Sequence, residues 1–399
     1  MKKIFTLAVL TFIITSIITS DIFAIPAFAR KYGMTCKTCH SPFPKLKAYG
    51  DEFAANGFVL KDQDAPRYFV ETGDPELSLI RELPLALRLE GYVTYNQTKT
   101  EQSDFTTPVL FKLLSGGSIA KDVSYYVYYI LENGEAGKIE DAWLMFNNLF
   151  GSTLDVSIGQ FQVCDPIFKR ELRLTKDDYF IYKVRPGNSQ VDLTYDRGIM
   201  FAYGFDSGTD VTLEIVNGSG IGERFMGGNF DNDKYKNIMG RISQDAGEHL
   251  RLGAMGYWGK EEQKSPEGDF NETNQLWMLG GDATISFDPL EMNLQYVERK
   301  DGNPYFFRNG GIFYINPPKD LKTRGAFAEL IYRPDGDDSK WYAVGLFNWI
   351  ESDQTDLNYK TLSGHFGYLL RRNIRFVGEL TYDFKQEYAK IGVGFVTAF

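Results

Sequence analysis

Two cysteines and a histidine stand together near the start of the chain, as Cys36-Lys37-Thr38-Cys39-His40. Thiols three positions apart can add to the two vinyl groups of a haem, and the next imidazole can then bind the iron. The same pair could be a redox dithiol or half of a zinc site. A dithiol motif requires a βαβ context, which is missing here, and a zinc site requires a further protein ligand. We therefore predict one haem c, attached through Cys36 and Cys39, with His40 as the proximal iron ligand.

The rest of the chain offers little other chemistry. Cys164 follows a strand-like segment as a lone thiol, for which we expect a structural role. We find no Ser-His-Asp, metal-carboxylate or phosphate-loop arrangement, so no catalytic residue is predicted. Asp335, Asp337 and Asp338 form an acidic cluster that could collect cations outside the cell, although solvated loop charges are more common.

The residues before the motif read as an export signal. Lys2 and Lys3 precede a largely apolar stretch, 4–18, and small residues follow at Ala24 and Ala29. The apolar stretch is too short to span a membrane, so we favour removal of residues 1–24 over an uncleaved anchor. Removal takes the formal net charge from −10 to −11, because it deletes two lysines and one aspartate. The sequence contains no basic patch that would indicate binding to nucleic acid.

The segment 25–60 has its own character. Behind the cysteine motif, Leu46, Tyr49, Phe53 and Ala54 recur at helical spacing. Pro44 suits the first turn of a helix, and Gly57 suits the position after its end. We expect a short amphipathic helix whose apolar face rests on the haem. Residues 61–83 lack a sustained period and read as a linker.

From Pro84 to the end, apolar and polar residues alternate, which predicts half-buried β-strands. The clearest segments are 85–95, 154–158, 211–215, 250–258, 290–294 and 374–384. Short connections such as 244–248 and 371–373 separate some of them. Longer polar stretches, at 260–274, 299–323 and 335–340, separate others. Short turns on the periplasmic side and long loops outside are typical of a transmembrane β-barrel.

The final strand and the composition agree with a barrel in the outer membrane. Ile391, Val393, Phe395 and Phe399 share one face, and the aromatic residues, 24 Tyr and 31 Phe, suit interfacial girdles. A soluble secreted sandwich or propeller is the alternative. At about 10 residues per tilted strand, residues 84–399 allow about 16 strands, within a range of about 14 to 18. The predicted fold class is thus an all-β outer-membrane barrel with a small helical N-terminal haem segment.

The distal ligand of the iron is left open by the sequence. The two other histidines, His249 and His365, are expected to face the barrel lumen, and Met34 lies close to the motif. Each of the three is a weak candidate for the distal ligand, and a packing or wall residue is the favoured interpretation for each. A five-coordinate iron is the remaining alternative.

The segment around the motif resembles a known family. Pro26 to Arg30, Gly33, the cysteine motif, Phe43-Pro44, Tyr49-Gly50 and Gly57-Phe58 are similar to the head of the fused cytochrome–porins, which include the outer-membrane iron oxidases of iron-oxidising bacteria. The resemblance implies a monohaem head in the lumen or at the periplasmic mouth of the barrel.

The same resemblance implies a role. Electrons would pass from an extracellular donor, with Fe(II) favoured, to a periplasmic c-type cytochrome, which makes an extracellular Fe(II) oxidase one expectation. Two alternatives remain. The chain could be a porin with a structural or sensing haem, or an outward conduit that reduces extracellular acceptors.

Overall fold

The computed structural model describes residues 27–60, 69–97, 102–222, 228–231, 233–264, 271–305 and 320–399. The predicted export signal, 1–24, lies outside the described residues, as do residues 61–68 of the predicted linker. The described part of the linker, 69–83, contains one isolated bridge, between Phe69 and Ile80.

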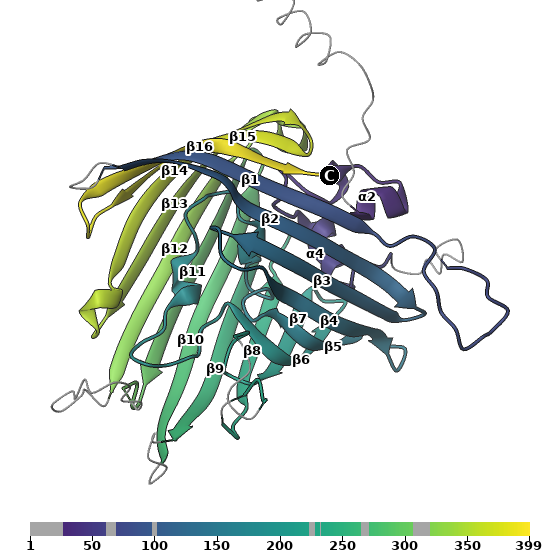
Figure 1. Ribbon diagram of the computed structural model, residues 1–399, viewed down its shortest axis with the longest axis horizontal. Helices are drawn as coiled ribbons and strands as arrows, with labels where there is room; N and C mark the ends of the chain where they lie inside the picture. Colours follow the sequence, from purple (N-terminus) through teal and green to yellow (C-terminus); the bar gives the residue numbers. More distant parts are fainter. Residues whose placement is uncertain are drawn as a thin grey trace, which may run out of the picture.

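Sixteen antiparallel strands form a closed barrel, in which each strand pairs with its neighbours in sequence and β1 also pairs with β16 (Figure 1). The predicted class and strand number are therefore confirmed. The strands are β1 Leu85–Asn96, β2 Gln102–Ala120, β3 Val123–Glu132, β4 Lys138–Leu149, β5 Leu154–Gln162, β6 Tyr195–Gly204, β7 Thr209–Val216, β8 Asn237–Asp245, β9 Leu250–Lys264, β10 Asn271–Phe287, β11 Leu290–Asp301, β12 Leu321–Tyr332, β13 Trp341–Ser352, β14 Tyr359–Arg371, β15 Ile374–Asp383 and β16 Tyr388–Ala398.

The apolar faces of the strands point outward and the polar faces point inward. Exposed apolar side chains occur around the wall, among them Val93, Leu144, Ile158, Leu213, Leu252, Leu279, Leu330, Phe366, Leu380 and Val393. Buried polar side chains line the interior, among them Glu90, Lys112, Arg241, Asp282, Asn293, Arg299, Glu329, Asn348, Arg375 and Glu379. A water-soluble β-protein has the opposite arrangement, so this barrel is built to span a membrane.

The two ends of the barrel differ. We call the end that holds the C-terminus the turn end, because its connections are short: 121–122, 150–153, 205–208, 246–249, 288–289, 333–340 and 372–373. The opposite loop end carries the connections 163–194, 217–236 and 302–320. The sequence placed the acidic stretch 335–340 with the external loops. That prediction is wrong, because this stretch lies at the turn end.

Another predicted loop is shorter than expected. The described residues of the polar stretch 260–274 are strand, because β9 extends to Lys264 and β10 begins at Asn271. At about 3.4 Å per residue, the 17 residues of β10 extend about 58 Å, and a tilt of about 45° leaves about 40 Å along the barrel axis. Since the hydrocarbon layer measures about 30 Å, the strand runs on beyond it with polar residues.

Three short helices precede the barrel: α2 Ala27–Tyr32, α3 Cys36–Cys39 and α4 Ala48–Ala55. They lie at the turn end, beside the C-terminus (Figure 1). The predicted helix exists as α4, but it begins four residues after Pro44. Leu46 instead pairs with His40 in an isolated bridge, so it cannot belong to the helix. None of the helices in the described ranges is long and apolar enough to cross a membrane.

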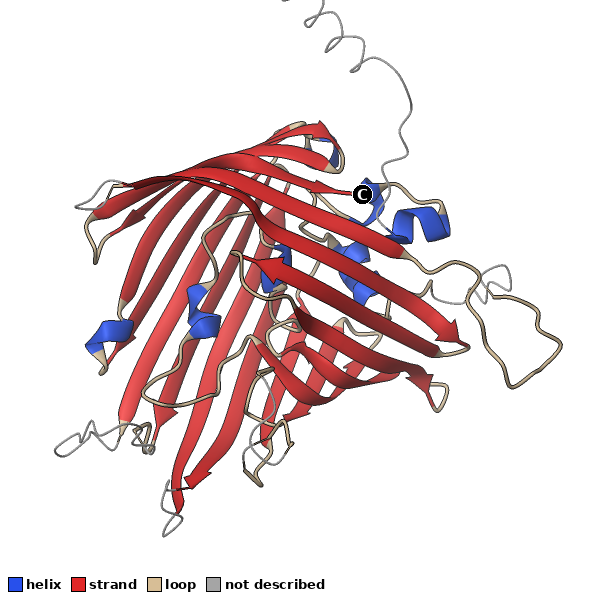
Figure 2. Ribbon diagram, viewed as in Figure 1, coloured by secondary structure: helices blue, strands red, loops and turns tan. Residues whose placement is uncertain are grey.

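The connection 163–194 folds back into the barrel and fills much of its middle. It contains the short helices η2 Arg170–Leu172 and η3 Phe180–Lys183, which lie inside the barrel in Figure 2. Its apolar side chains, such as Ile181 and Tyr182, pack against Met255, Phe327 and Leu346 of the wall. The lumen is therefore narrowed by an apolar cluster rather than left as an open channel. Within the described ranges, the other helices are η4 Gly336–Asp338 and η5 Thr355–Leu357.

The tip of this inserted segment is hydrogen-bonded to the far wall. The backbone N–H groups of Lys176 and Asp177 donate to the Glu379 carboxylate over 2.6 and 2.8 Å. The Asp177 carboxylate in turn accepts hydrogen bonds from four wall side chains: Asn348, Tyr359, Thr361 and Ser363. Asp177 thus holds the segment across the lumen.

We predict that Asp177→Ala opens the lumen. The substitution removes four hydrogen bonds to a charged group, which lowers the free energy holding the tip by about 3 kcal/mol or more. Single-channel conductance in planar bilayers should rise. Asp206→Ala, in the exposed turn 205–208, is the matched control and should conduct like the unaltered chain. Equal conductance of the two variants would contradict the role given to Asp177.

Candidate cofactor site

The Cys-x-x-Cys-His motif forms one helical turn followed by an extended residue. Cys36 and Cys39 are the ends of α3, and the backbone N–H of His40 donates to the carbonyl oxygen of Cys36 over 2.9 Å. The two thiols are partly exposed and form no disulfide. Burial raises the pKa of both thiols above the ordinary value, so both are protonated at neutral pH. The predicted site residues are thus held together on one short element.

The imidazole of His40 is oriented by its own chain. Its Nδ1 lies 2.8 Å from the carbonyl oxygen of Pro44, so Nδ1–H donates and the Nε2 lone pair is left for another partner. Its ring packs edge-on against Phe43, with centroids 5.1 Å apart. Burial lowers the pKa of His40 to about 4, against the opposing effect of backbone hydrogen bonds at Pro44 and Lys45. A neutral imidazole with a fixed Nδ1–H is the form that binds iron.

These residues fit a c-type haem by their chemistry. Two reduced thiols and one imidazole with an available Nε2 are the donor set that covalent attachment requires. The crevice beside Cys36 and His40 is narrow, with a volume of about 10 Å³, and Leu369 and Arg372 of the wall line it. Since this volume accepts about one water molecule, a porphyrin in the crevice would displace side chains that now line it.

Charged side chains attach the motif segment to the turn end of the barrel. Lys45 forms a largely buried ion pair with Glu291 of β11, at 2.6 Å. Burial alone would lower the pKa of Lys45, but the Glu291 carboxylate raises it above the ordinary value. Arg333 donates to both the carbonyl oxygen and the hydroxyl of Ser41, each over 3.0 Å. These contacts join residues that are far apart in the sequence, and sequence reasoning did not find them.

The acidic cluster is part of this attachment. Asp338 pairs with Lys37 at 3.0 Å and Asp337 pairs with Lys47 at 2.8 Å. Arg372 of the neighbouring turn also pairs with Asp338, at 3.2 Å. The alternative in which Asp337 and Asp338 collect external cations is therefore not supported, because lysines of the motif segment already pair with them at the turn end.

Aromatic packing completes the contact with the barrel. Phe53 of α4 meets Phe58 edge-on, with centroids 5.8 Å apart. Phe58 then packs on Tyr126 of β3 at 4.8 Å and stacks with Trp143 of β4 at 6.3 Å. The apolar face of α4 therefore rests on barrel aromatics through Phe58, where the sequence predicted that it rests on the haem.

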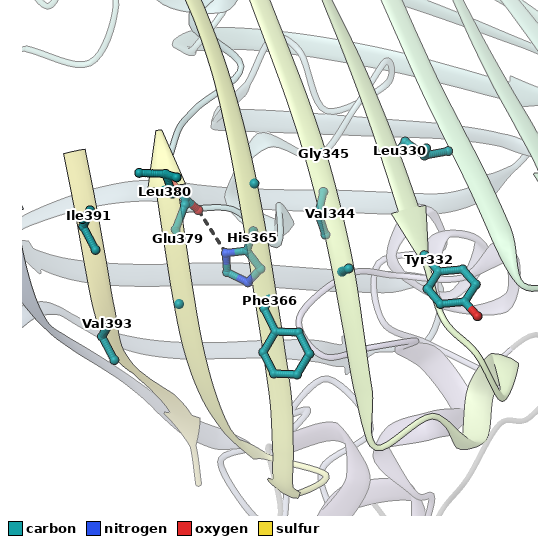
Figure 3. Close-up of a pocket in the computed structure, with 13 residues that line it drawn as sticks. Leu330, Tyr332, Val344, Gly345, His365, Phe366, Glu379, Leu380, Ile391 and Val393 are labelled. Carbon is teal, nitrogen blue, oxygen red and sulfur yellow. Dashed lines mark hydrogen bonds and ion pairs between the residues drawn. The ribbon is translucent and has the colours of Figure 1, made fainter. Parts of the chain in front are cut away.

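His365, the first distal candidate, faces the interior as predicted, but both of its ring nitrogens have partners. Nδ1 is 3.0 Å from Glu379 (Figure 3). Nε2 is 3.4 Å from the hydroxyl of Tyr342. Outside this stretch of wall lies an apolar hollow of about 580 Å³, bordered by exposed side chains such as Leu330 and Val393.

The other two candidates lie elsewhere. His249 was expected in the lumen, which is wrong: its exposed ring stacks on Phe287, an outward-facing residue of β10, with centroids 4.3 Å apart. It occupies a turn, where the alternation of the strand no longer fixes its side. Met34 is partly exposed, two residues before Cys36. Cys164 is fully buried and donates to the side-chain oxygen of Gln162 over 3.6 Å, in agreement with a structural role.

Comparison with solved structures places the barrel among porins in fold. An anion-selective porin from Comamonas acidovorans matches with a TM-score of 0.57 and 11% identity, over 80% of this chain and 99% of that one. OmpF of Salmonella typhi, solved with daunomycin, gives 0.56 and 10%, over 81% and 100%. A loop-deletion mutant of OmpT from Vibrio cholerae gives 0.53 and 12%, over 80% and 99%.

At these identities the likeness establishes the fold, and it supports the predicted location in the outer membrane. No protein-family model matches the chain, and no curated protein matches it either.

We predict that Lys45→Met loosens the motif segment. The Glu291 carboxylate would lose its closest buried partner and keep only the longer pair with Arg333, at 3.7 Å, so the cost is below the value of about 3 kcal/mol for a buried charge left alone. The rate of chymotrypsin cleavage within residues 27–60 should rise in detergent-solubilised protein. Lys37→Met removes the exposed pair with Asp338, which is worth less than about 1 kcal/mol, so this control should be cleaved like the unaltered chain. Equal rates for both variants would show that the Lys45 pair does not attach the segment.

Proposed function

We propose that this chain is an outer-membrane electron-transfer protein with one c-type haem at the turn end of a porin-like barrel. The observation that carries the proposal is the geometry of the motif. Cys36 and Cys39 are unpaired thiols on one turn, and His40 has its Nδ1–H fixed by Pro44 and its Nε2 available. When bound there, the group supplies a one-electron couple.

The chain's own residues have defined tasks in this proposal. Cys36 and Cys39 hold the group through thioether bonds, and His40 binds its iron. Lys45 and Arg333 hold the motif segment against the barrel. An extracellular donor, with Fe(II) favoured, loses one electron, and a periplasmic c-type cytochrome at the turn end accepts it. The resemblance of the motif segment to the fused cytochrome–porins supports this direction.

The second candidate function is solute transport, with the haem in a structural or sensing role. The likeness of the barrel to porins in fold favours it. The apolar cluster that the segment 163–194 forms inside the lumen weighs against a wide channel. A conduit in the outward direction would use the same residues with the donor and the acceptor exchanged.

Attachment of the haem is tested with the double variant Cys36→Ala/Cys39→Ala. We expect the unaltered protein, produced with a c-type maturation system, to keep a haem stain after denaturing electrophoresis. The double variant should lose the stain entirely, because no thioether can form. Cys164→Ala is the matched control and should stain normally. Stain that persists in the double variant would disprove attachment at this motif.

Electron transfer and transport are separated in liposomes. Protein with oxidised haem is mixed with external Fe(II), and protein with reduced haem is mixed with external Fe(III), at acidic and neutral pH. If the chain transfers electrons, external Fe(II) should reduce the haem after mixing, and little of an entrapped solute should leak from the liposomes. Rapid solute leakage without any change in the haem spectrum would instead support transport.

A further inference from the structure

A buried arginine close to the motif segment lacks an anionic partner. Arg375 of β15 faces the interior and is 3% exposed. It donates from Nη1 to the hydroxyl of Tyr342, and its Nε has no hydrogen-bond partner. Among the residues that the structure describes, no carboxylate forms an ion pair with it. A buried guanidinium with an unused N–H donor is costly, so this position favours the arrival of a hydrogen-bond acceptor.

The register of the strands places Arg375 beside the motif segment. On one side its cross-strand partner is Leu369, which lines the crevice next to Cys36 and His40. On the other side its partner is Val396, which packs against Phe43. Both neighbours of Arg375 on the wall therefore contact the segment that carries the motif.

A second arginine flanks the same contact from β1. Arg88 is the cross-strand partner of Ala398, which also packs against Phe43. Arg88 pairs with Glu90 and donates from Nη1 to the carbonyl oxygen of Glu171 over 3.0 Å, while its Nε is buried without a partner. It lies near enough to His40 to contribute to the low pKa of that imidazole. Arg88 and Arg375 thus stand on either side of β16, under Phe43.

The nearby carboxylates are already engaged. Glu90 pairs with Arg88 and accepts from Tyr92 over 3.2 Å. Glu379 is held by His365 and by two backbone N–H groups of the inserted segment. Arg375 therefore has no ion-pair partner among these residues, and the Nε–H groups of Arg88 and Arg375 are two unused donors.

We propose that Arg375 and Arg88 form a carboxylate receptor in the barrel wall, which takes the propionate groups of the haem attached at Cys36 and Cys39. A haem carries two propionates, and guanidinium groups bind carboxylates through paired, charge-assisted hydrogen bonds. This inference rests on the proposed haem attachment and adds a role for the barrel. The wall would set the potential of the couple as well as hold the segment.

The receptor is tested in haem-containing protein by substituting the unpaired arginine. Arg375→Gln removes a buried positive charge near the iron, which favours the ferric over the ferrous state. We expect the equilibrium to move by about tenfold, equivalent to a midpoint potential lower by about 59 mV for one electron. The propionate bending bands in the resonance Raman spectrum should shift as well. Both measurements are made on protein that stains normally for haem.

Two further variants make the result decisive. Arg324→Gln, an exposed residue at the loop end that pairs with Glu298, is the matched control and should leave potential and bands unchanged. Arg375→Lys keeps the charge but loses the paired hydrogen bonds, so it should retain most of the potential and still shift the bands. If Arg375→Gln fails to fold, the bands of Arg375→Lys provide the test.

Unchanged potential and bands in both Arg375 variants, with haem present, would overturn the receptor and leave the proposed function intact. Protein without any haem stain would overturn both proposals. A small dicarboxylate distinguishes a receptor for free anions from one for propionates. If succinate raises the melting temperature of Cys36→Ala/Cys39→Ala while haem-containing Arg375 variants behave normally, the site binds free carboxylates, and the propionate assignment fails.

Discussion

The pairing of β1 with β16 is the constraint on which the rest of the molecule depends. Residues 88–96 pair in register with residues 390–398, and this ladder turns an open sheet into a ring. In hydrocarbon no water can satisfy a free strand edge, so a membrane-spanning sheet must close. Closure also joins the start and the end of the barrel sequence at one place. The motif segment, which precedes β1, is thereby brought next to the last residues of the chain, Val396 and Ala398.

Closure creates a polar interior that must satisfy its own charges. Arg241 pairs with Asp282 at 2.6 Å and Arg299 pairs with Asp301 at 2.7 Å, all of them buried. Arg299 also donates to the carbonyl oxygens of Val184 and Val191, so the wall satisfies the backbone of the inserted segment. In the described part of the chain, buried side-chain atoms without a hydrogen-bond partner occur on Arg88, Glu90, Arg173, Glu214, Asn237, Arg333 and Arg375. The unpaired Nε groups of Arg88 and Arg375 lie where the motif segment meets the wall.

The sequence was informative where one physical requirement acts along a strand. Contact with lipid requires an apolar outer face. The alternation of apolar and polar residues therefore located the strands and placed His365 on the inner face of the barrel. The same reasoning failed at His249, since a turn residue is not bound to the alternation. It failed at 260–274, because strands that extend past the hydrocarbon become polar while remaining paired. Sequence reasoning also placed the start of the helix too early. The Pro44 carbonyl oxygen accepts a hydrogen bond from the His40 side chain, and Pro44 does not lie in the first turn of α4.

Contacts between distant parts of the chain could not be read from local patterns. In the sequence, Asp337 and Asp338 look like solvated loop residues. In the structure they form ion pairs with Lys47 and Lys37, which attach the motif segment to the barrel. Which end of the barrel carries a connection depends on how many strands precede it. The acidic stretch was assigned to the wrong side because the assignment used its length and polarity and no count of strands.

The position of the motif limits how electrons could reach a single haem. Cys36 and His40 lie at the turn end, and β10 rises about 40 Å along the barrel axis. A soluble cytochrome at the turn end would meet the motif segment directly. A donor at the loop end would have to enter the interior, where the segment 163–194 packs against the wall and Asp177 fixes its tip. In the proposed function the donor is therefore a small ion, and the attachment of this inserted segment governs how close it comes.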